Sequence, residues 1–393
     1  MYTKGMRKID ERRLKRKKIL VVSSLIFIVI CIILVCSLYI AQKGVRDWVD
    51  IHILGKNLTE DDTQIINLNT DKSNQIHVYS KYIAILNDKI VSLYNSYGEK
   101  VDEIKVDINT GIFDSDDKYF VVAEKQGDEV CLIFDKTYLW SENVEGEILQ
   151  VEVNQNGYVA VVTEDVTHKS VLTFYNSEGE KLFTSYFAST RIIDLSISKD
   201  NKYVAIAEID TTGTVVQSAV KIISAQNAQN DAENAITYVY NLNSENLITN
   251  VEYQANGQIS YLYDNGISVI KNEKNEDIIK IENENIAFVA NELKNSAVYI
   301  KEESAGLFKS ESNVHMINTF NNQEKIYKLE EVAKELYTKN DIVAINTGTQ
   351  IYFLDTNGWL IRKYTSKQEI TNVEFSRNLA AIIYKDKVII VSL

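Results

Sequence analysis

Two short sequence phrases recur in a fixed order from about residue 63 to the end of this chain. The first is a polar turn followed by an apolar run that begins with tyrosine, as in SDDKYFVVAE, NQNGYVAVVTE and SKDNKYVAIAE. The second joins a strand-like run to a turn containing Asn or Asp and Gly, as in SLYNSYGEKV, TFYNSEGEKLF and YFLDTNGWLI. Asn, Asp and Gly tolerate the positive φ angles that tight hairpins need. The order of the two phrases therefore predicts four-stranded antiparallel meanders.

The repeat units define the fold class. They begin near Gln75, Asp107, Glu147, Thr190, Leu247, Asn285, Glu331 and Gln368. Units of roughly 40 residues with four strands each are typical of a β-propeller. We predict an all-β fold, a β-propeller with eight blades over residues 63–393, and seven blades is the alternative. The last unit has room for about three strands, and residues 63–69 could supply the fourth and close the ring.

Two segments interrupt the repeat. Residues 224–235 have the sequence SAQNAQNDAENA, which predicts a polar loop that lengthens the fourth unit. Within residues 325–337, apolar side chains follow helical spacing, so a short helix is predicted there. These side chains belong to Ile326, Leu329, Val332, Ala333 and Leu336.

An uncharged apolar stretch, residues 19–40, precedes the repeats. A helix of this length spans about 33 Å, enough to cross a hydrocarbon core of about 30 Å. Nine Lys or Arg residues lie within residues 1–18, and such cations keep their end of a span in the cytoplasm. We therefore expect a basic cytoplasmic tail (1–18), a transmembrane helix (19–40), a stem or linker (41–62) and an extracytoplasmic propeller (63–393). A cleaved signal peptide is the alternative, although its apolar region is usually shorter.

Charge separates the two ends of the chain and predicts different partners for them. The whole chain carries −13, and residues 1–18 carry +7, so the remainder carries −20. The basic tail should attract anionic lipid head groups. The acidic body should repel phosphates, which argues against nucleic acid as a partner.

The sequence contains no glycine-rich phosphate loop, HExxH or GxSxG motif. The four histidines are scattered along the chain and predict no joint site: His52, His77, His168 and His315. Glu302 and Glu303 have the side chains of a glycosidase pair, but such pairs are expected by chance in an acidic chain. We therefore predict no catalytic, cofactor-binding or metal-binding residues and no cofactor.

Three aspartates, Asp114, Asp116 and Asp117, resemble part of a calcium loop. The glycine and the distal glutamate of such a loop are missing, so we predict an ordinary turn between strands. Cys131 is isolated, which predicts a buried hydrophobic role rather than a disulfide. Tyrosines beside the turns predict packing between blades, and Trp140 and Trp359 suit either exposed recognition or packing at strand ends.

The basic tail, the single apolar span, the absence of proline and the YNSxGEK-like turns together resemble one known group. It is an uncharacterised family of single-pass membrane proteins from low-GC Gram-positive bacteria, a domain of unknown function. The resemblance implies the propeller and the topology and brings no catalytic residues. The chain is thus expected to be a membrane-anchored extracytoplasmic propeller that binds or scaffolds envelope proteins or cell-wall ligands. The alternatives are an envelope polysaccharide hydrolase or lyase, and a sensor signalling to the cytoplasmic tail.

Overall fold

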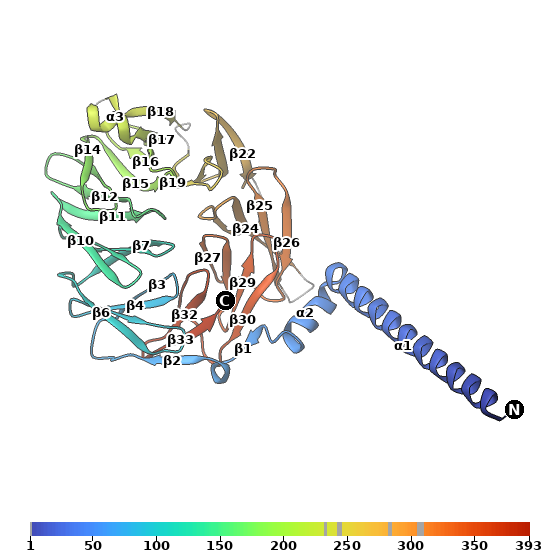
Figure 1. Ribbon diagram of the computed structural model, residues 1–393. Helices are drawn as coiled ribbons and strands as arrows, with labels where there is room; N and C mark the ends of the chain where they lie inside the picture. The colour runs from blue at the N-terminus through green and yellow to red at the C-terminus, as the bar shows by residue number, and fades with distance from the viewer. Residues whose placement is uncertain (1, 232–233, 242–245, 282–284, 305–309) are drawn as a thin grey trace. The chain divides into compact units, whose positions relative to one another are not determined.

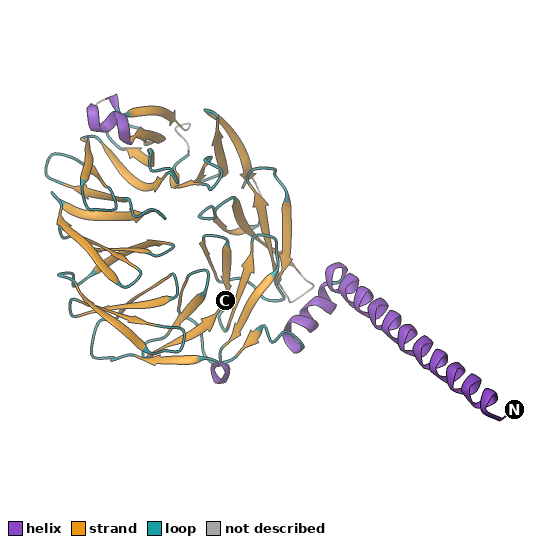
Figure 2. Cartoon of the chain, viewed as in Figure 1, coloured by secondary structure: helices purple, strands orange, loops and turns teal. Residues whose placement is uncertain are grey.

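Eight antiparallel sheets surround a common centre in chain order (Figure 1). The computed structural model describes residues 2–231, 234–241, 246–281, 285–304 and 310–393. Contacts between residues divide the chain into two units, residues 1–57 and residues 58–393. In the described part of the second unit, nearly all regular structure is strand, and α3 and η1 are its helical segments (Figure 2).

The first four blades are regular meanders, in which neighbours in sequence are neighbours in the sheet. The first blade contains β3 (Gln75–Tyr79), β4 (Tyr82–Asn87), β5 (Ile90–Tyr94) and β6 (Lys100–Lys105). The second contains β7 (Gly111–Asp116), β8 (Tyr119–Glu124), β9 (Glu129–Phe134) and β10 (Thr137–Asn143). The third contains β11 (Glu147–Val153), β12 (Val159–Glu164), β13 (Ser170–Tyr175) and β14 (Lys181–Phe187). The fourth contains β15 (Thr190–Ile197), β16 (Tyr203–Asp210), β17 (Gln217–Ser224) and β18 (Ile236–Asn241).

The next three blades repeat this order. The fifth contains β19 (Ile248–Tyr253), β20 (Ile259–Tyr263), β21 (Gly266–Lys271) and β22 (Lys274–Lys280). The sixth contains β23 (Ile286–Ala290), β24 (Ser296–Ser304), β25 (Ser310–Asn318) and β26 (Glu324–Lys328). The seventh contains β27 (Glu335–Lys339), β28 (Ile342–Asn346), β29 (Gln350–Asp355) and β30 (Leu360–Thr365), with the short β1 (Asn57–Leu58) beside β30.

The eighth blade closes the ring with a strand from the other end of the repeat region. Its C-terminal strands are β31 (Asn372–Phe375), β32 (Leu379–Ile383) and β33 (Lys387–Ser392). β2 (Gln64–Asn67), which follows the 3-10 turn η1 (Glu60–Asp62), pairs antiparallel with β33 and completes the sheet. The predicted closure by residues 63–69 is confirmed, as is the eight-bladed propeller. The predicted unit boundaries lie within four residues of the first strands of the blades.

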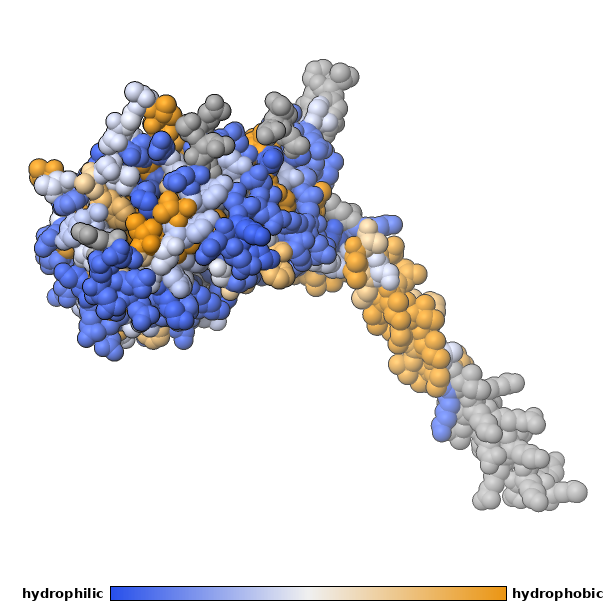
Figure 3. Space-filling view, turned by 90° about the horizontal axis from the view of Figure 1, so that it is seen from above, coloured by the Kyte–Doolittle hydropathy of each residue, from blue (hydrophilic) through white to orange (hydrophobic). Residues whose placement is uncertain are grey.

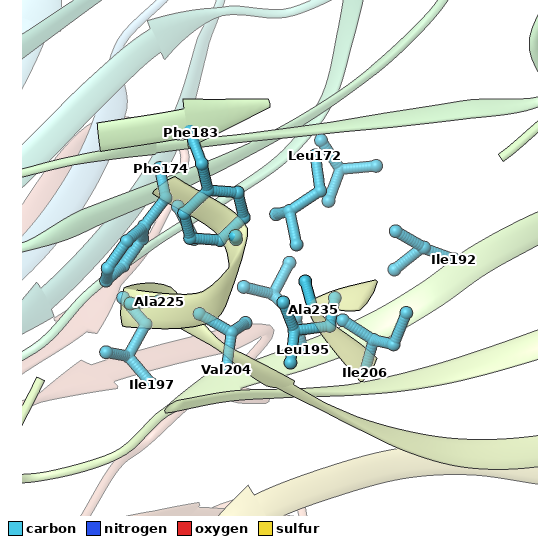
Figure 4. Close-up of a cluster of buried hydrophobic side chains, with 14 of the residues drawn as sticks. Leu172, Phe174, Phe183, Ile192, Leu195, Ile197, Val204, Ile206, Ala225 and Ala235 are labelled. Atoms are coloured by element: carbon cyan, nitrogen blue, oxygen red, sulfur yellow. The ribbon is translucent and has the colours of Figure 1, made fainter. Parts of the chain in front are cut away.

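Hydrophobic packing between neighbouring blades holds the ring together. The described buried apolar residues form eight clusters, and each cluster joins one blade to the next. Figure 4 shows the cluster between the third and fourth blades, where Leu172 and Phe174 face Leu195 and Val204. The eighth interface joins the last blade to the first and includes Ile66 of β2. Because burial of apolar surface drives folding, each blade depends on both neighbours for its stability.

Aromatic residues at strand ends belong to these interfaces, as predicted. Tyr119 packs between the second and third blades, and Tyr158 packs between the third and fourth. Trp140 is buried, and its Nε1 donates a hydrogen bond to the carbonyl of Ser177 at 3.2 Å. Gly179, in that same turn, has a φ of 85°, and a Cβ there would lie 2.9 Å from the Trp140 ring. Trp140 is therefore a packing residue, and the glycine turn of the repeat is shaped to receive it.

Two local predictions are wrong. Within residues 224–235, α3 (Ala225–Asn230) replaces part of the expected loop, with the hydroxyl of Ser224 accepting from the backbone N–H of Asn227. This helix buries Ala225 and Ala228 against the third and fourth blades.

The other wrong prediction is the helix at residues 325–337, where the structure has β26, a turn and β27. Leu329 and Ala333 are buried in this turn, and their backbone N–H groups donate to the carbonyl and hydroxyl of Ser312. The positions of these two apolar side chains are thus set by packing against β25 and not by a helix.

The first unit contains the apolar helix. α1 (Tyr2–Ala41) includes one stretch, Leu20–Ala41, that is long and apolar enough to cross a membrane, and it lies near the N-terminus, where signal sequences also occur. Its described side chains are largely exposed and appear as an orange band in Figure 3. Part of the expected stem is helical, as α2 (Lys43–His52). Asp50 of α2 is fully buried, accepts a hydrogen bond from the Tyr39 hydroxyl and pairs with Lys56 at 3.0 Å.

Candidate functional site: the central channel

The first strands of the eight blades line a central channel. It consists of three adjoining cavities with volumes of about 520, 340 and 300 Å³. Lys339 of β27 lines all three. The largest cavity is bordered by the second to seventh blades, and the 340 Å³ cavity by the fifth to eighth. Small-molecule sites typically occupy cavities of this size.

One register position of the first strand contributes a residue to the channel lining in seven of the eight blades, and in the first blade the equivalent residue, His77, contacts Ser115 and Lys339 of the lining. The residue at this position pairs with the third residue of the apolar run that follows the first turn of the blade. Glu152, for example, pairs with Ala160, the third residue of the run that begins at Tyr158. The eight residues at this position are His77, Asp114, Glu152, Ser196, Glu252, Ala290, Tyr337 and Glu374. Seven of the eight carry a polar or ionisable group, and the sixth blade has only the methyl group of Ala290. The channel is therefore polar, and half of these eight residues are acidic.

Several channel carboxylates bind the backbone of the next blade. Asp114 accepts from the N–H of Val153 at 2.8 Å, and Glu152 accepts from the N–H of Ile197 at 2.9 Å. Asp194 precedes Ser196, the channel residue of β15, by two positions and accepts from the N–H of Val251 at 2.7 Å. The inner edge of a sheet presents unpaired N–H groups, and these carboxylates satisfy them. The acids thus tie the second to fifth blades together.

Crowding of these acids raises their proton affinity. Burial, followed by repulsion from Asp114 and Glu252, raises the pKa of Glu152 well above its usual range. Burial likewise raises the pKa of Asp194 to about 7, although the Val251 N–H and Gln150 oppose the shift. For Glu252, burial and then repulsion by Glu292 raise the pKa well above its usual range. Burial and like charges in one poorly hydrated space favour the protonated form, so these carboxyl groups hold their protons to higher pH than exposed ones do.

A second network of polar side chains joins the first, second, seventh and eighth blades at the channel. Nε2 of His77 in β3 lies 2.8 Å from the Ser115 hydroxyl, and its Nδ1 lies 3.4 Å from Oε2 of Glu374. Lys339 donates to the same hydroxyl at 2.9 Å. Burial and the Lys339 charge lower the pKa of His77, so the imidazole is neutral. Burial opposes ionisation of Glu374, but its hydrogen bond to His77 and the nearby charges hold its pKa below the usual value.

Glu374, His77 and Ser115 form a chain of carboxylate, imidazole and hydroxyl groups like that of a catalytic triad. A nucleophilic serine must leave room for a substrate carbonyl within about 3 Å of its hydroxyl. Here the ammonium of Lys339 donates to that hydroxyl, and Ser115 is only 6% exposed. We therefore interpret the four residues as a polar tie between the first, second, seventh and eighth blades.

The structure places the residues singled out in the sequence at several different locations. Asp114 and Asp116 belong to β7 and line the channel, so the prediction that they form a turn is wrong for these two and correct for Asp117, whose φ is 51°. Their strand position follows from pairing with β8, which extends the sheet to Asp116. Glu302 and Glu303 lie near the outer end of the β24–β25 hairpin, away from the channel lining.

Two of the other histidines, His168 and His315, have local partners and do not line the channel. His168 lies in the turn after β12 and binds Asp165, and His315 of β25 binds Glu324 at 2.8 Å. His52 ends α2. Cys131 is fully buried between the first and second blades, as predicted. Trp359 is half-buried in the glycine turn before β30, where its backbone N–H donates to Oδ1 of Asp355.

Sequence reasoning missed the channel ring, although a signal was present. Glu152, Ser196 and Glu252 each precede a predicted turn by two residues, at Asn154, Ser198 and Gln254. Comparing the residues before each turn would have shown that one position of the repeat is acidic or polar in most units. The network around His77 has no such signal, because its members are up to 297 positions apart and meet only when the ring closes. Within the described residues, no group of three or more His, Cys, Asp or Glu side chains is suited to hold a metal ion.

A family model described as a family of unknown function, DUF5711, matches residues 58–393. This match covers well over half of the chain. The chain belongs to the DUF5711 family. The matched residues coincide with the second unit, so the family is defined by the propeller. Comparison with curated protein sequences finds no match.

Solved structures with the same fold share little sequence with this DUF5711 propeller. BamB from Moraxella catarrhalis has a TM-score of 0.50 and 11% identity, over 84% of this chain and 98% of that chain. The β-propeller domain of Cps50 (Swd1) from Myceliophteria thermophila has a TM-score of 0.46 and 12% identity, over 84% and 99%. Apo AztD from Citrobacter koseri has a TM-score of 0.44 and 10% identity, over 76% and 87%. At 11% identity, the likeness to BamB is one of fold alone.

Proposed function

We propose that this protein is a non-enzymatic binding module, held at the outer face of the cytoplasmic membrane by α1, with its propeller outside the cell. The observation that carries the proposal is the central channel, a charged hollow whose inner carboxylates are fixed by hydrogen bonds to neighbouring blades. Side chains held in this way offer a preformed recognition surface at little entropic cost. The ligand is a protein or cell-wall component of the envelope.

Two further observations support the anchored topology. The apolar stretch of α1 is long enough to span a membrane. Nine cations precede it and favour retention of the N-terminus in the cytoplasm. The acidic propeller has no comparable excess of positive charge to hold it inside. The basic tail then contacts anionic lipid.

A polysaccharide hydrolase is the second candidate, because several carboxylates converge on one cavity and Asp194 has a pKa of about 7. A general acid needs such a pKa. Asp194, however, accepts hydrogen bonds from Val251 and Gln150 at both of its oxygens. That geometry suits a positioning role better than proton transfer, so binding is the favoured function.

In-cell crosslinking of the full-length protein tests the binding function. A photoreactive amino acid at Asn378, in the turn beside the channel mouth, should capture a specific partner. The matched control places the same group at Glu142, on the outer strand β10. Capture from residue 378 but not from residue 142 supports recognition at the channel. Equal capture from both positions contradicts it.

A further inference from the structure

The 340 Å³ cavity exists because one blade lacks a channel side chain. Seven blades carry a larger side chain at the inward register position, whereas the sixth carries Ala290, which lines this cavity. The space in front of Ala290 is bordered by Glu292 from the same blade and Asn250 from the fifth. A pocket therefore opens at one defined point of the ring.

Buried hydrogen-bond acceptors at this pocket lack donors. Asn291 is 1% exposed, and its Nδ2 donates to the Ser260 hydroxyl at 3.2 Å, but its Oδ1 has no partner among the described residues. Asn250 donates to Oε1 of Glu292 at 3.1 Å, and its own Oδ1 is likewise buried without a described donor. A buried acceptor without a donor costs about 1–3 kcal/mol. Both asparagines line the cavity, so rotation of their side-chain amides would bring these buried oxygens to the N–H donors of a ligand there.

The charges around the pocket leave one negative charge to be balanced. Two carboxylates, Glu292 and Glu374, and one ammonium, that of Lys339, line the pocket, and the hydrogen-bond partners of the two carboxylates, Asn250 and His77, are both neutral. The ammonium of Lys339 is engaged by Ser115. A single carboxylate and two amide oxygens match a monovalent cation with three donors, as in a primary ammonium group. A divalent metal ion would favour more anionic oxygens.

Part of the remaining wall of the pocket is apolar, and the pocket is larger than a bare ion requires. Leu262, Val289, Leu336, Val373 and Phe375 contribute to its lining. A pocket of this composition suits an alkyl chain that ends in the charged group, because burial of methylene groups adds about 0.8 kcal/mol each.

We infer that this pocket binds the primary ammonium group of an alkylamine, either a lysine side chain of a partner protein or a free diamine. The inference rests on the proposed binding function and specifies the ligand class that the channel takes. The ammonium nitrogen would lie among Oδ1 of Asn250, Oδ1 of Asn291 and the carboxylate of Glu292.

Calorimetric titration of the full-length protein in detergent micelles tests the inference. The probes are N-acetyl-lysine methylamide, 1,4-diaminobutane, and N-acetyl-norleucine methylamide as an uncharged ligand of similar shape. Saturable binding of either amine, without binding of the norleucine compound, supports the inference. Tighter binding of the lysine compound indicates a protein partner, and tighter binding of the diamine indicates a free amine. Binding of the norleucine compound with equal affinity overturns it.

Two variants locate the site. Glu292→Gln should weaken amine binding about tenfold or more, because a charged hydrogen bond is lost. Ala290→Leu should abolish binding by filling the pocket. Glu142→Gln removes the same charge from the outer strand β10 and should leave the affinity within about twofold. Unchanged affinity in folded Glu292→Gln overturns the inference, as does displacement of the amine by equimolar Mg²⁺.

Failure of the inference is distinguishable from failure of the proposed function. If no amine binds but residue 378 still captures a specific partner in cells, the ligand class is wrong and the binding function stands. If the propeller is found on the cytoplasmic side, the proposed function fails whatever the pocket binds.

Discussion

The raised pKa of a single channel residue, Asp194, makes the stability of the propeller depend on pH. Its pKa rises to about 7 in the folded protein from an ordinary value of 3.8. A raised pKa means that the folded state holds its proton more tightly than the unfolded state. The stabilising contribution is present below about pH 4 and is lost as the pH rises toward 7. Ionised Asp194 therefore destabilises the propeller at neutral pH.

The variant Asp194→Asn should be more stable than the wild type at pH 8 and nearly equal to it at pH 4. Asparagine retains an acceptor for the Val251 N–H but carries no charge. The difference at pH 8 should reach up to about 2–4 kcal/mol, given about 1.4 kcal/mol for each pKa unit. Urea unfolding at several pH values measures it. If the stability difference between the variant and the wild type did not change with pH, the pKa of Asp194 would not be raised by folding.

Gly266 illustrates a different constraint at the residue scale. It begins β21 with a φ of 155°, and a Cβ added there would lie 1.9 Å from the carbonyl oxygen of Ile279 in β22. Gly266→Ala must displace one of the two strands, so we expect a loss of roughly 2–4 kcal/mol in unfolding free energy. Gly213→Ala is the matched control, since its nearest contact would be an ordinary 3.5 Å. Equal thermal stability of both variants would contradict the close strand approach.

At the scale of single elements, β2 determines whether the ring closes. Ile66 is 4% exposed and packs between the eighth and first blades, whereas its neighbour Ile65 on the same strand is 39% exposed. Ile66→Ala should cost about 2–4 kcal/mol by removing buried methyl groups from the closing interface. Ile65→Ala should cost under about 1 kcal/mol. Denaturant unfolding of both variants measures the difference, and similar losses would argue against closure through β2.

The elements were predictable where the repeat controls them. The hairpin turn of Asn176 and Gly179 recurs with the same side-chain hydrogen bonds at Asn95 and Asp355, so local sequence suffices to define it. The helix predicted at residues 325–337 failed because Leu329 and Ala333 are positioned by β25, which periodicity cannot reveal. α3 was missed because its buried alanines pack in the cluster between the third and fourth blades, which the local sequence cannot reveal.

At the scale of the whole molecule, the ring brings distant residues to one axis. The acidic channel position could have been read from the repeat, since Glu152 and Glu252 occupy equivalent places before their turns. The pocket at Ala290 could not, because it depends on what the fifth, seventh and eighth blades contribute. Sequence therefore predicted the architecture, whereas the site emerged only from the closed ring.

Topology is the central claim at this scale, because a binding module of the envelope must lie outside the cytoplasmic membrane. Val166 lies in the turn after β12 and is fully exposed, so Val166→Cys offers a reactive thiol on the propeller. The native Cys131 is buried, and Cys31 and Cys36 lie in the apolar stretch of α1. A background in which Cys31 and Cys36 are replaced by serine isolates the new thiol, and a cysteine at Lys8 in the basic tail reports the opposite side.

The most direct test treats intact cells with a membrane-impermeant maleimide. The account predicts that the thiol at position 166 reacts in intact cells and that the thiol at position 8 reacts only after lysis. Reaction of position 166 only after lysis would place the propeller in the cytoplasm and contradict the account.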